Sequence, residues 1–149
     1  MKEHYFDDLK VGDRFKSEPL NVTEKQLIEF AHKFDPQMFH LSRKRAERTI
    51  FKGLVASGWH TAAMTMRLLV DSDFQPAGGI IGAGFDEMQW PRPVRPGDEL
   101  RVESEILEVR PSKSRPDQGV IKARTTTLNQ DGEAVQISVG NLMVSRRPR

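Results

Sequence analysis

The stretch that decides the fold runs from residue 53 to residue 70 and reads Gly53-Leu54-Val55-Ala56-Ser57-Gly58-Trp59-His60-Thr61-Ala62-Ala63-Met64-Thr65-Met66-Arg67-Leu68-Leu69-Val70. A helix built from it carries apolar residues around most of its circumference, so we expect it to be buried on nearly all sides. It is too short and too often interrupted by polar residues to span a bilayer, which needs about 20 predominantly apolar residues. The stretch therefore predicts a helix at the centre of a globular fold and no membrane association.

After Gly79 the pattern changes to that of β-strands. Turn signals separate four expected strands, and a shorter one precedes the helix, at residues 14–20, 80–90, 99–109, 119–128 and 134–145. Consecutive strands with short connections pair mostly antiparallel. A curved antiparallel β-sheet wrapped around one long central helix buries the apolar face of both, which predicts the α+β hot-dog fold. No repeat or linker-like stretch divides residues 1–149, so we expect a single domain.

A second, shorter helix is expected before the central one. Thr23 begins a capping box, because its hydroxyl can accept an early helix amide and Gln26 follows three residues later. Apolar residues recur at helical spacing from about Glu24 to Phe34. Pro36 ends this helix, because the residue before a proline is pushed out of the helical region. The polar, basic segment at residues 41–52 has room for a helical turn or two.

Composition narrows the function classes. A chain of 149 residues has the usual size of one domain. It contains no cysteine and starts without the apolar core of a signal peptide, so we expect a cytoplasmic protein. A net charge of only +2 argues against nucleic acid as a partner. Its histidines are not spaced as a metal motif, so no metal site is expected.

Asp35 and His40 lie five positions apart in Phe34-Asp35-Pro36-Gln37-Met38-Phe39-His40. On a continuous helix, side chains at this spacing point about 140° apart. The break that Pro36 imposes allows them to turn toward one cavity, where a carboxylate and an imidazole form an acid–base pair. The alternative is that Asp35 accepts hydrogen bonds from turn amides and His40 is a partly buried, hydrogen-bonded side chain.

Gly58 lies in the first turns of the central helix. Backbone N–H groups there lack intrahelical partners, and the helix dipole favours negative charge. A glycine also lets a substrate carbonyl approach the backbone closely. The position therefore suits an oxyanion site, and the alternative is a packing glycine where the helix passes under a strand.

The stretch from Asp35 to Leu41, together with the one from Gly53 to Ala62, resembles the MaoC-like acyl dehydratases, relatives of the (R)-specific enoyl-CoA hydratases. The resemblance extends to Phe6–Gly12, Trp90–Asp98 and Arg110–Pro116, so it covers nearly the whole chain. It implies a hot-dog fold, at least a homodimer, and an acyl-CoA that lies near the subunit boundary.

The signature of this family reads Asp, any residue, Asn, Pro, any residue, His. Asp35 and His40 match its catalytic pair in identity and spacing. Gln37 stands where the asparagine is usual, and Met38 stands where the proline is usual. The resemblance therefore implies the family's catalytic chemistry more strongly than it implies the family's substrate.

The family usually has a His-Gly pair at the start of the central helix, and this chain has Ser57-Gly58. Gly58 therefore carries over as the oxyanion amide, and Ser57 only as its neighbour. The resemblance implies hydration of a 2-enoyl thioester, or its reverse, with Asp35 and His40 activating water and returning a proton. No redox cofactor or metal is implied, since CoA is part of the substrate.

Lys113 and Arg115, in the proline- and serine-rich loop, are candidates for contacts with the CoA phosphates. The alternative for both is solvated surface charge. Two other functions stay open: a hot-dog thioesterase, which would direct water at the thioester carbonyl, and an acyl-CoA-binding domain without catalysis.

Overall fold

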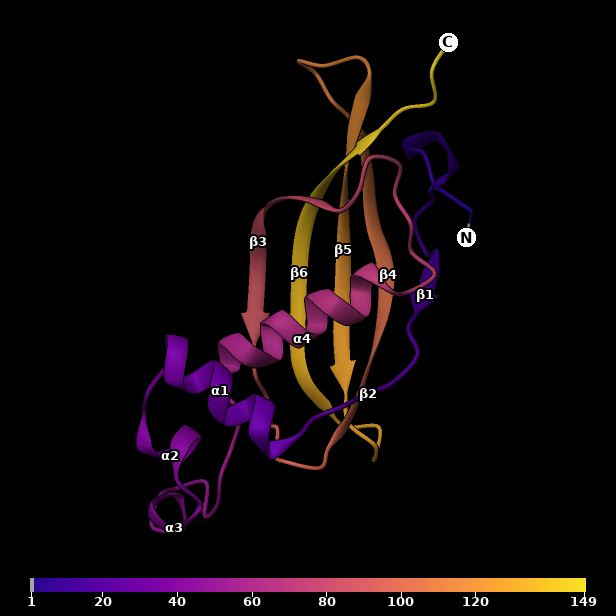
Figure 1. Ribbon diagram of the computed structural model, residues 1–149. Coiled ribbons are helices and arrows are strands. Elements are labelled where there is room, and N and C mark those ends of the chain that lie inside the picture. The colour runs from indigo at the N-terminus through magenta and orange to yellow at the C-terminus, as the bar shows by residue number, and fades with distance from the viewer. Residues whose placement is uncertain (1) are drawn as a thin grey trace.

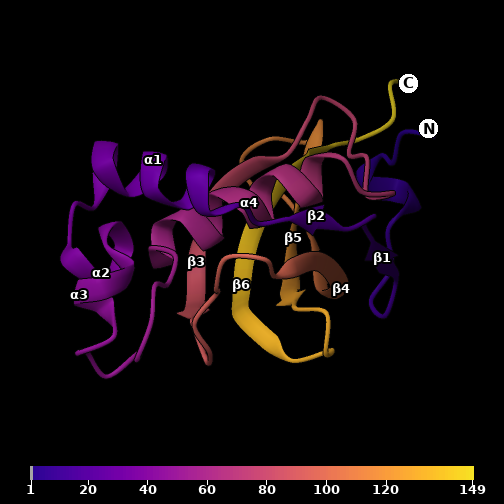
Figure 2. The same cartoon turned by 60° about the horizontal axis from the view of Figure 1, so that its bottom comes forward.

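The computed structural model describes residues 2–149 and contains one antiparallel sheet that curves around the central helix. The strand order is β1-β4-β5-β6-β3, with β2 also paired to β4. The strand bounds are β1 Arg14–Lys16, β2 Leu20–Asn21, β3 Ile81–Gln89, β4 Glu99–Pro111, β5 Gln118–Leu128 and β6 Ala134–Ser145. The central helix α4 (Gly58–Val70) crosses the concave face of this sheet, as Figures 1 and 2 show. The hot-dog fold predicted from the sequence is confirmed.

The strand predictions hold to within two residues at each end, with one exception. The single strand expected at residues 14–20 is split into β1 and β2, which both pair with β4. Pro19 lies between them and has no N–H to donate to a ladder, so the pairing is interrupted there.

Three short helices gather at one end of the sheet, beyond the end of β3 (Figures 1 and 2). They are α1 (Glu24–Phe34), α2 (Met38–Leu41) and α3 (Arg43–Ala46), and a single 3-10 turn, η1 (Phe6–Asp8), lies near the chain's start. α1 has the predicted bounds, and Thr23 caps it by accepting a hydrogen bond from Gln26 N at 3.2 Å.

α4 is covered by the sheet and, near its start, by α1, where Phe30 stacks on His60 with 4.7 Å between the ring centroids. The inner face of α4, with Met64 and Leu68, packs on the sheet, but Trp59 and Met66 on the other side are 61% and 44% exposed. The prediction that this helix is buried on nearly all sides is therefore wrong for one stripe, because one sheet can cover only one side of a helix. No helix within residues 2–149 is long and apolar enough to cross a membrane.

The exposed stripe of α4 continues onto the edge strand β3. Phe85 on β3 is 59% exposed and lines a hollow of about 440 Å³ together with Trp59 and Met66. We call this surface, defined by Trp59, Met66 and Phe85, the α4–β3 face. It is a contiguous apolar patch beside an edge strand whose outer side has no partner within residues 2–149.

Candidate active site

Asp35 and His40 lie side by side across a break between two helices. Asp35 is the C-cap of α1, and its backbone is no longer helical (φ −153°, ψ 66°). The chain then passes Pro36 and enters α2, which carries His40. This turn brings His40 Nε2 to 3.2 Å from Asp35 Oδ2. The convergence expected from the proline break is therefore present.

The other ring nitrogen of His40 fixes the tautomer. His40 is buried, and its Nδ1 lies 2.7 Å from the carbonyl oxygen of Val55. A carbonyl oxygen only accepts, so Nδ1 carries a hydrogen and donates it. Nε2 is therefore the nitrogen that takes up or releases a proton, and it faces the carboxylate.

Two further groups donate to the carboxylate of Asp35. Ser57 Oγ donates to Oδ2 at 2.7 Å, and Gln37 Nε2 donates to Oδ1 at 2.6 Å. Burial works to raise the pKa of Asp35, but the hydrogen bonds from Gln37 and Ser57 and the charge of His40 outweigh it and hold the pKa below its usual 3.8. Asp35 is thus a carboxylate at neutral pH.

Neither donor was predicted from the sequence. The signal that could have found them is that Gln37 and Ser57 are positions where the chain departs from the family pattern, and both departures are polar residues that can donate to a carboxylate. Ser57 is fully buried, and it precedes Gly58 directly.

Gly58 is the first residue of α4, so its N–H lies at the positive end of the helix dipole. It lines a hollow of about 380 Å³ that also contains His40 and Trp90. A Cβ atom at position 58 would lie 2.9 Å from Cε2 of Trp90. Gly58 is thus closely packed, against the ring of Trp90 and not under a strand, and this packing is compatible with a role for the amide, because the packing and the N–H involve different atoms.

The structure does not bring Lys113 and Arg115 to this site within one chain. Both are exposed in the loop between β4 and β5, at the opposite end of the sheet from α1 and α2 (Figure 1). β4 has 13 residues, and a strand rises about 3.3 Å per residue, so its ends lie up to about 40 Å apart. Within one chain, Lys113 and Arg115 therefore lie far from Asp35.

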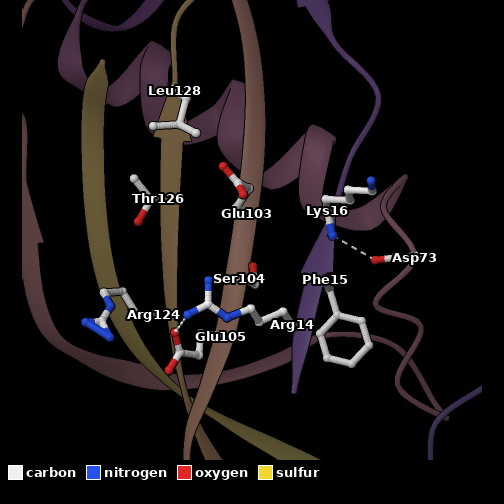
Figure 3. Close-up of a pocket in the computed structure, with 10 residues that line it drawn as sticks. All are labelled: Arg14, Phe15, Lys16, Asp73, Glu103, Ser104, Glu105, Arg124, Thr126 and Leu128. Atoms are coloured by element: carbon white, nitrogen blue, oxygen red, sulfur yellow. Dashed lines mark hydrogen bonds and ion pairs between the residues drawn. The ribbon is translucent and has the colours of Figure 1, made fainter. Parts of the chain in front are cut away.

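A different hollow, of about 490 Å³, lies on the outer face of the sheet (Figure 3). Its walls are charged, and Arg14 pairs there with Glu105 at 3.0 Å. Lys16 N donates to Asp73 Oδ1 at 2.8 Å. The side chains in this hollow include no histidine, and the charges neutralise one another, so it does not compete with the Asp35–His40 pair as a catalytic site.

Comparison with known proteins identifies the family. A family model described as "MaoC like domain" matches residues 8–129. The chain belongs to this family. The crystal structure of the MaoC-like dehydratase from Rhodospirillum rubrum is 53% identical to it, with a TM-score of 0.94 over 98% of this chain and 99% of that one.

The names of two further relatives state an enzymatic activity. The unliganded (R)-hydratase PhaJ1 from Pseudomonas aeruginosa is 27% identical, with a TM-score of 0.75 over 96% of this MaoC-like chain and 86% of the other. The mesaconyl-CoA hydratase of Cereibacter sphaeroides is 41% identical over 68 residues, which are 46% of this chain and 20% of that protein. This chain thus matches about a fifth of the length of the mesaconyl-CoA hydratase.

Proposed function

We propose that this MaoC-like protein is a hydratase or dehydratase that interconverts a 2-enoyl thioester and its 3-hydroxyacyl thioester. The observation that carries the proposal is the Asp35–His40 pair, with 3.2 Å between Nε2 and Oδ2, because His40 lines the same hollow as Gly58, the first residue of α4. A carboxylate, an imidazole and a helix-start N–H are the groups that addition of water to a conjugated thioester requires.

In the hydration direction, the Asp35–His40 pair takes a proton from water as the water oxygen forms a bond to C3. The π bond between C2 and C3 breaks, and its electrons move onto the thioester oxygen. The Gly58 N–H stabilises the charge on that oxygen. The pair then returns a proton to C2, so the enzyme ends in its starting state. Positioned acid–base groups of this kind contribute about 10²- to 10⁴-fold to the rate.

The name of one relative, mesaconyl-CoA hydratase, supports a CoA thioester as the substrate class, and the name of another, (R)-hydratase, supports hydration as the reaction. The reaction adds water across the C2–C3 double bond or removes it, and the protein is neither oxidised nor reduced. We therefore propose no redox cofactor. Assays with a short and a longer substrate test which length of acyl chain the protein accepts.

We also propose that the active form is a homodimer in which β3 pairs with β3 of a second copy. This pairing would cover the α4–β3 face and use the free edge of the sheet. In an antiparallel pair, the Ile81 end of one β3 lies beside the Gln89 end of the other. The loop with Lys113 and Arg115 then approaches the α1–α2 end of the partner, where a CoA phosphate could meet it.

The function is tested with a short and a longer trans-2-enoyl-CoA, by following loss of the enoyl-thioester absorbance and release of thiol in parallel. We expect loss of absorbance without thiol, abolished in Asp35→Asn. Thiol release alone would instead show a thioesterase. No reaction with either substrate, but binding of the CoA ester, would show a binding domain.

A further inference from the structure

Asp35 is held by groups other than its catalytic partner. Three contacts use its two oxygens: Ser57 and His40 on Oδ2, and Gln37 on Oδ1. His40 is the titratable group among them, while Ser57 and Gln37 are uncharged. A change at either uncharged residue therefore alters the titration of Asp35 through a hydrogen bond and not through a new or lost charge.

Ser57 makes two connections with one oxygen atom. Its hydroxyl donates to Asp35 Oδ2 at 2.7 Å, and the same Oγ accepts a hydrogen bond from Trp59 N at 3.2 Å, which caps α4. The backbone carbonyl of Ser57 accepts from Thr61 N at 3.0 Å, so the residue is fixed at both ends. Since Gly58 follows directly, Ser57 links the carboxylate to the helix-start amide.

We propose that Ser57 is a positioning residue that keeps Asp35 ionised and sets its place relative to the Gly58 amide, and that Gln37 supports it more weakly from the other oxygen. The difference in strength follows from burial. Ser57 is fully buried, whereas Gln37 is exposed, and water replaces a lost donor at an exposed site. For its effect on the rate, this inference rests on the proposed function.

The variants are chosen to separate donation from helix capping. Ser57→Gly removes the hydroxyl but leaves a residue that is well tolerated as an N-cap, and Ser57→Ala removes the hydroxyl and weakens the cap. Thr23→Ala is the matched control, because it removes the side-chain cap of α1, the helix that ends in Asp35, without touching the carboxylate. Gln37→Leu removes the second donor.

The first measurement is the pH profile of kcat/KM for hydration. When a buried carboxylate loses a hydrogen bond from a donor, its pKa rises by about one unit. We expect the acid limb that reports ionisation of Asp35 to move up by about one unit in Ser57→Gly and Ser57→Ala, with kcat reduced about 10-fold or more and KM changed less than about threefold. Gln37→Leu should move the limb by less than about half a unit, and Thr23→Ala should not move it.

The second measurement does not depend on activity. The side-chain carboxyl of Asp35 is titrated by ¹³C NMR in protein labelled at aspartate, with its signal assigned by its absence in Asp35→Asn. We expect the pKa of Asp35 to rise by about one unit in Ser57→Gly. If the wild type hydrates no enoyl-CoA, the proposed function fails, and this titration still decides the role of Ser57.

An unchanged Asp35 titration in folded Ser57→Gly would overturn the inference. It is also overturned if Ser57→Gly lowers kcat no more than Thr23→Ala does and leaves the acid limb in place, because a merely structural role predicts that result. If Ser57→Ala fails to fold, the Ser57→Gly variant carries the test, since its cap is the better one.

Discussion

His40 Nε2 lies 3.2 Å from Asp35 Oδ2, across the turn that Pro36 imposes between α1 and α2. Since Nδ1 of the same ring donates to the carbonyl of Val55, the ring cannot rotate without breaking a buried hydrogen bond. The pair is thus held ready before a substrate arrives, and the nitrogen that exchanges its proton lies on the side of the ring that faces the carboxylate. This geometry has consequences for activity, for acid stability and for the packing around α4.

Replacing His40 by glutamine should remove the group that carries the proton but keep a polar side chain of similar length. We expect hydration by His40→Gln to fall by about 10²- to 10⁴-fold in kcat, the usual contribution of a positioned acid–base group. His32→Gln is the matched control, because His32 is exposed on α1 and should leave kcat unchanged. A His40→Gln variant that keeps more than about a tenth of wild-type activity would show that His40 is not an acid–base group.

Asp35 should also make stability depend on pH in the acid range. Its pKa is lower in the folded state than its usual 3.8, so its contribution to stability is fully present above the unfolded pKa and is lost as pH falls through the folded pKa. The free energy of unfolding of the wild type, minus that of Asp35→Asn, should therefore be constant near neutrality and shrink below about pH 4. Urea unfolding at several pH values measures it, and a difference that grows toward low pH would contradict the sign.

Gly58→Ala tests the packing between α4 and Trp90. The added Cβ would lie 2.9 Å from Cε2 of the Trp90 ring, whose Nε1 is held at 2.9 Å by the buried Gln136. The ring cannot move away freely, so we expect Gly58→Ala to lose about 1–3 kcal/mol of unfolding free energy. Gly82→Ala is the control, because no atom lies within 4 Å of a Cβ there, and it should change stability by less than about 0.5 kcal/mol. Equal stability of the two variants would show that Trp90 adapts without cost.

The helices and strands were largely predictable from the sequence because their signals are local. Thr23 and Pro36 mark the ends of α1, and alternation of apolar residues with turn signals marks β4, β5 and β6. The exposure of Trp59 and Met66 was not predictable, because their pattern is the same whether the protein's own sheet or another surface covers them. Apolar periodicity indicates that a face is to be covered but not which chain covers it.

The candidate site was predictable where chemistry depends on residues close in sequence. The spacing of Asp35 and His40 and the break at Pro36 suffice to predict that they can converge. The bond from Ser57 to Asp35 joins positions 22 residues apart and depends on where α4 begins in space, so no one-dimensional pattern contains it. The same is true of Trp90 above Gly58.

The α4–β3 face should be the contact between two copies of the chain. Met66→Glu places a charge in the middle of this apolar patch, and burying an unpaired charge is costly, so we expect the variant to be a monomer. Thr126→Glu, on the outer face of the sheet in the hollow of Figure 3, is the control and should leave the mass unchanged. Light scattering after gel filtration gives the mass of each, and a wild type that elutes as a monomer at micromolar concentration would refute the proposed dimer.

If the dimer forms through β3, the loop with Lys113 and Arg115 should serve the site of the other copy. The double variant Lys113→Ala/Arg115→Ala should raise KM for an enoyl-CoA about 10-fold and leave kcat within about threefold, since lost contacts with remote phosphates weaken ground-state and transition-state binding alike.

Mixing this double variant with Asp35→Asn tests whether the loop acts across the interface. Asp35→Asn should be inactive alone. Mixing the two under conditions that exchange subunits should produce heterodimers in which an intact Asp35 meets the intact loop of the other copy. We therefore expect a component with the wild-type KM to appear on mixing. If mixing restores no such component although heterodimers form, the loop does not act across the interface.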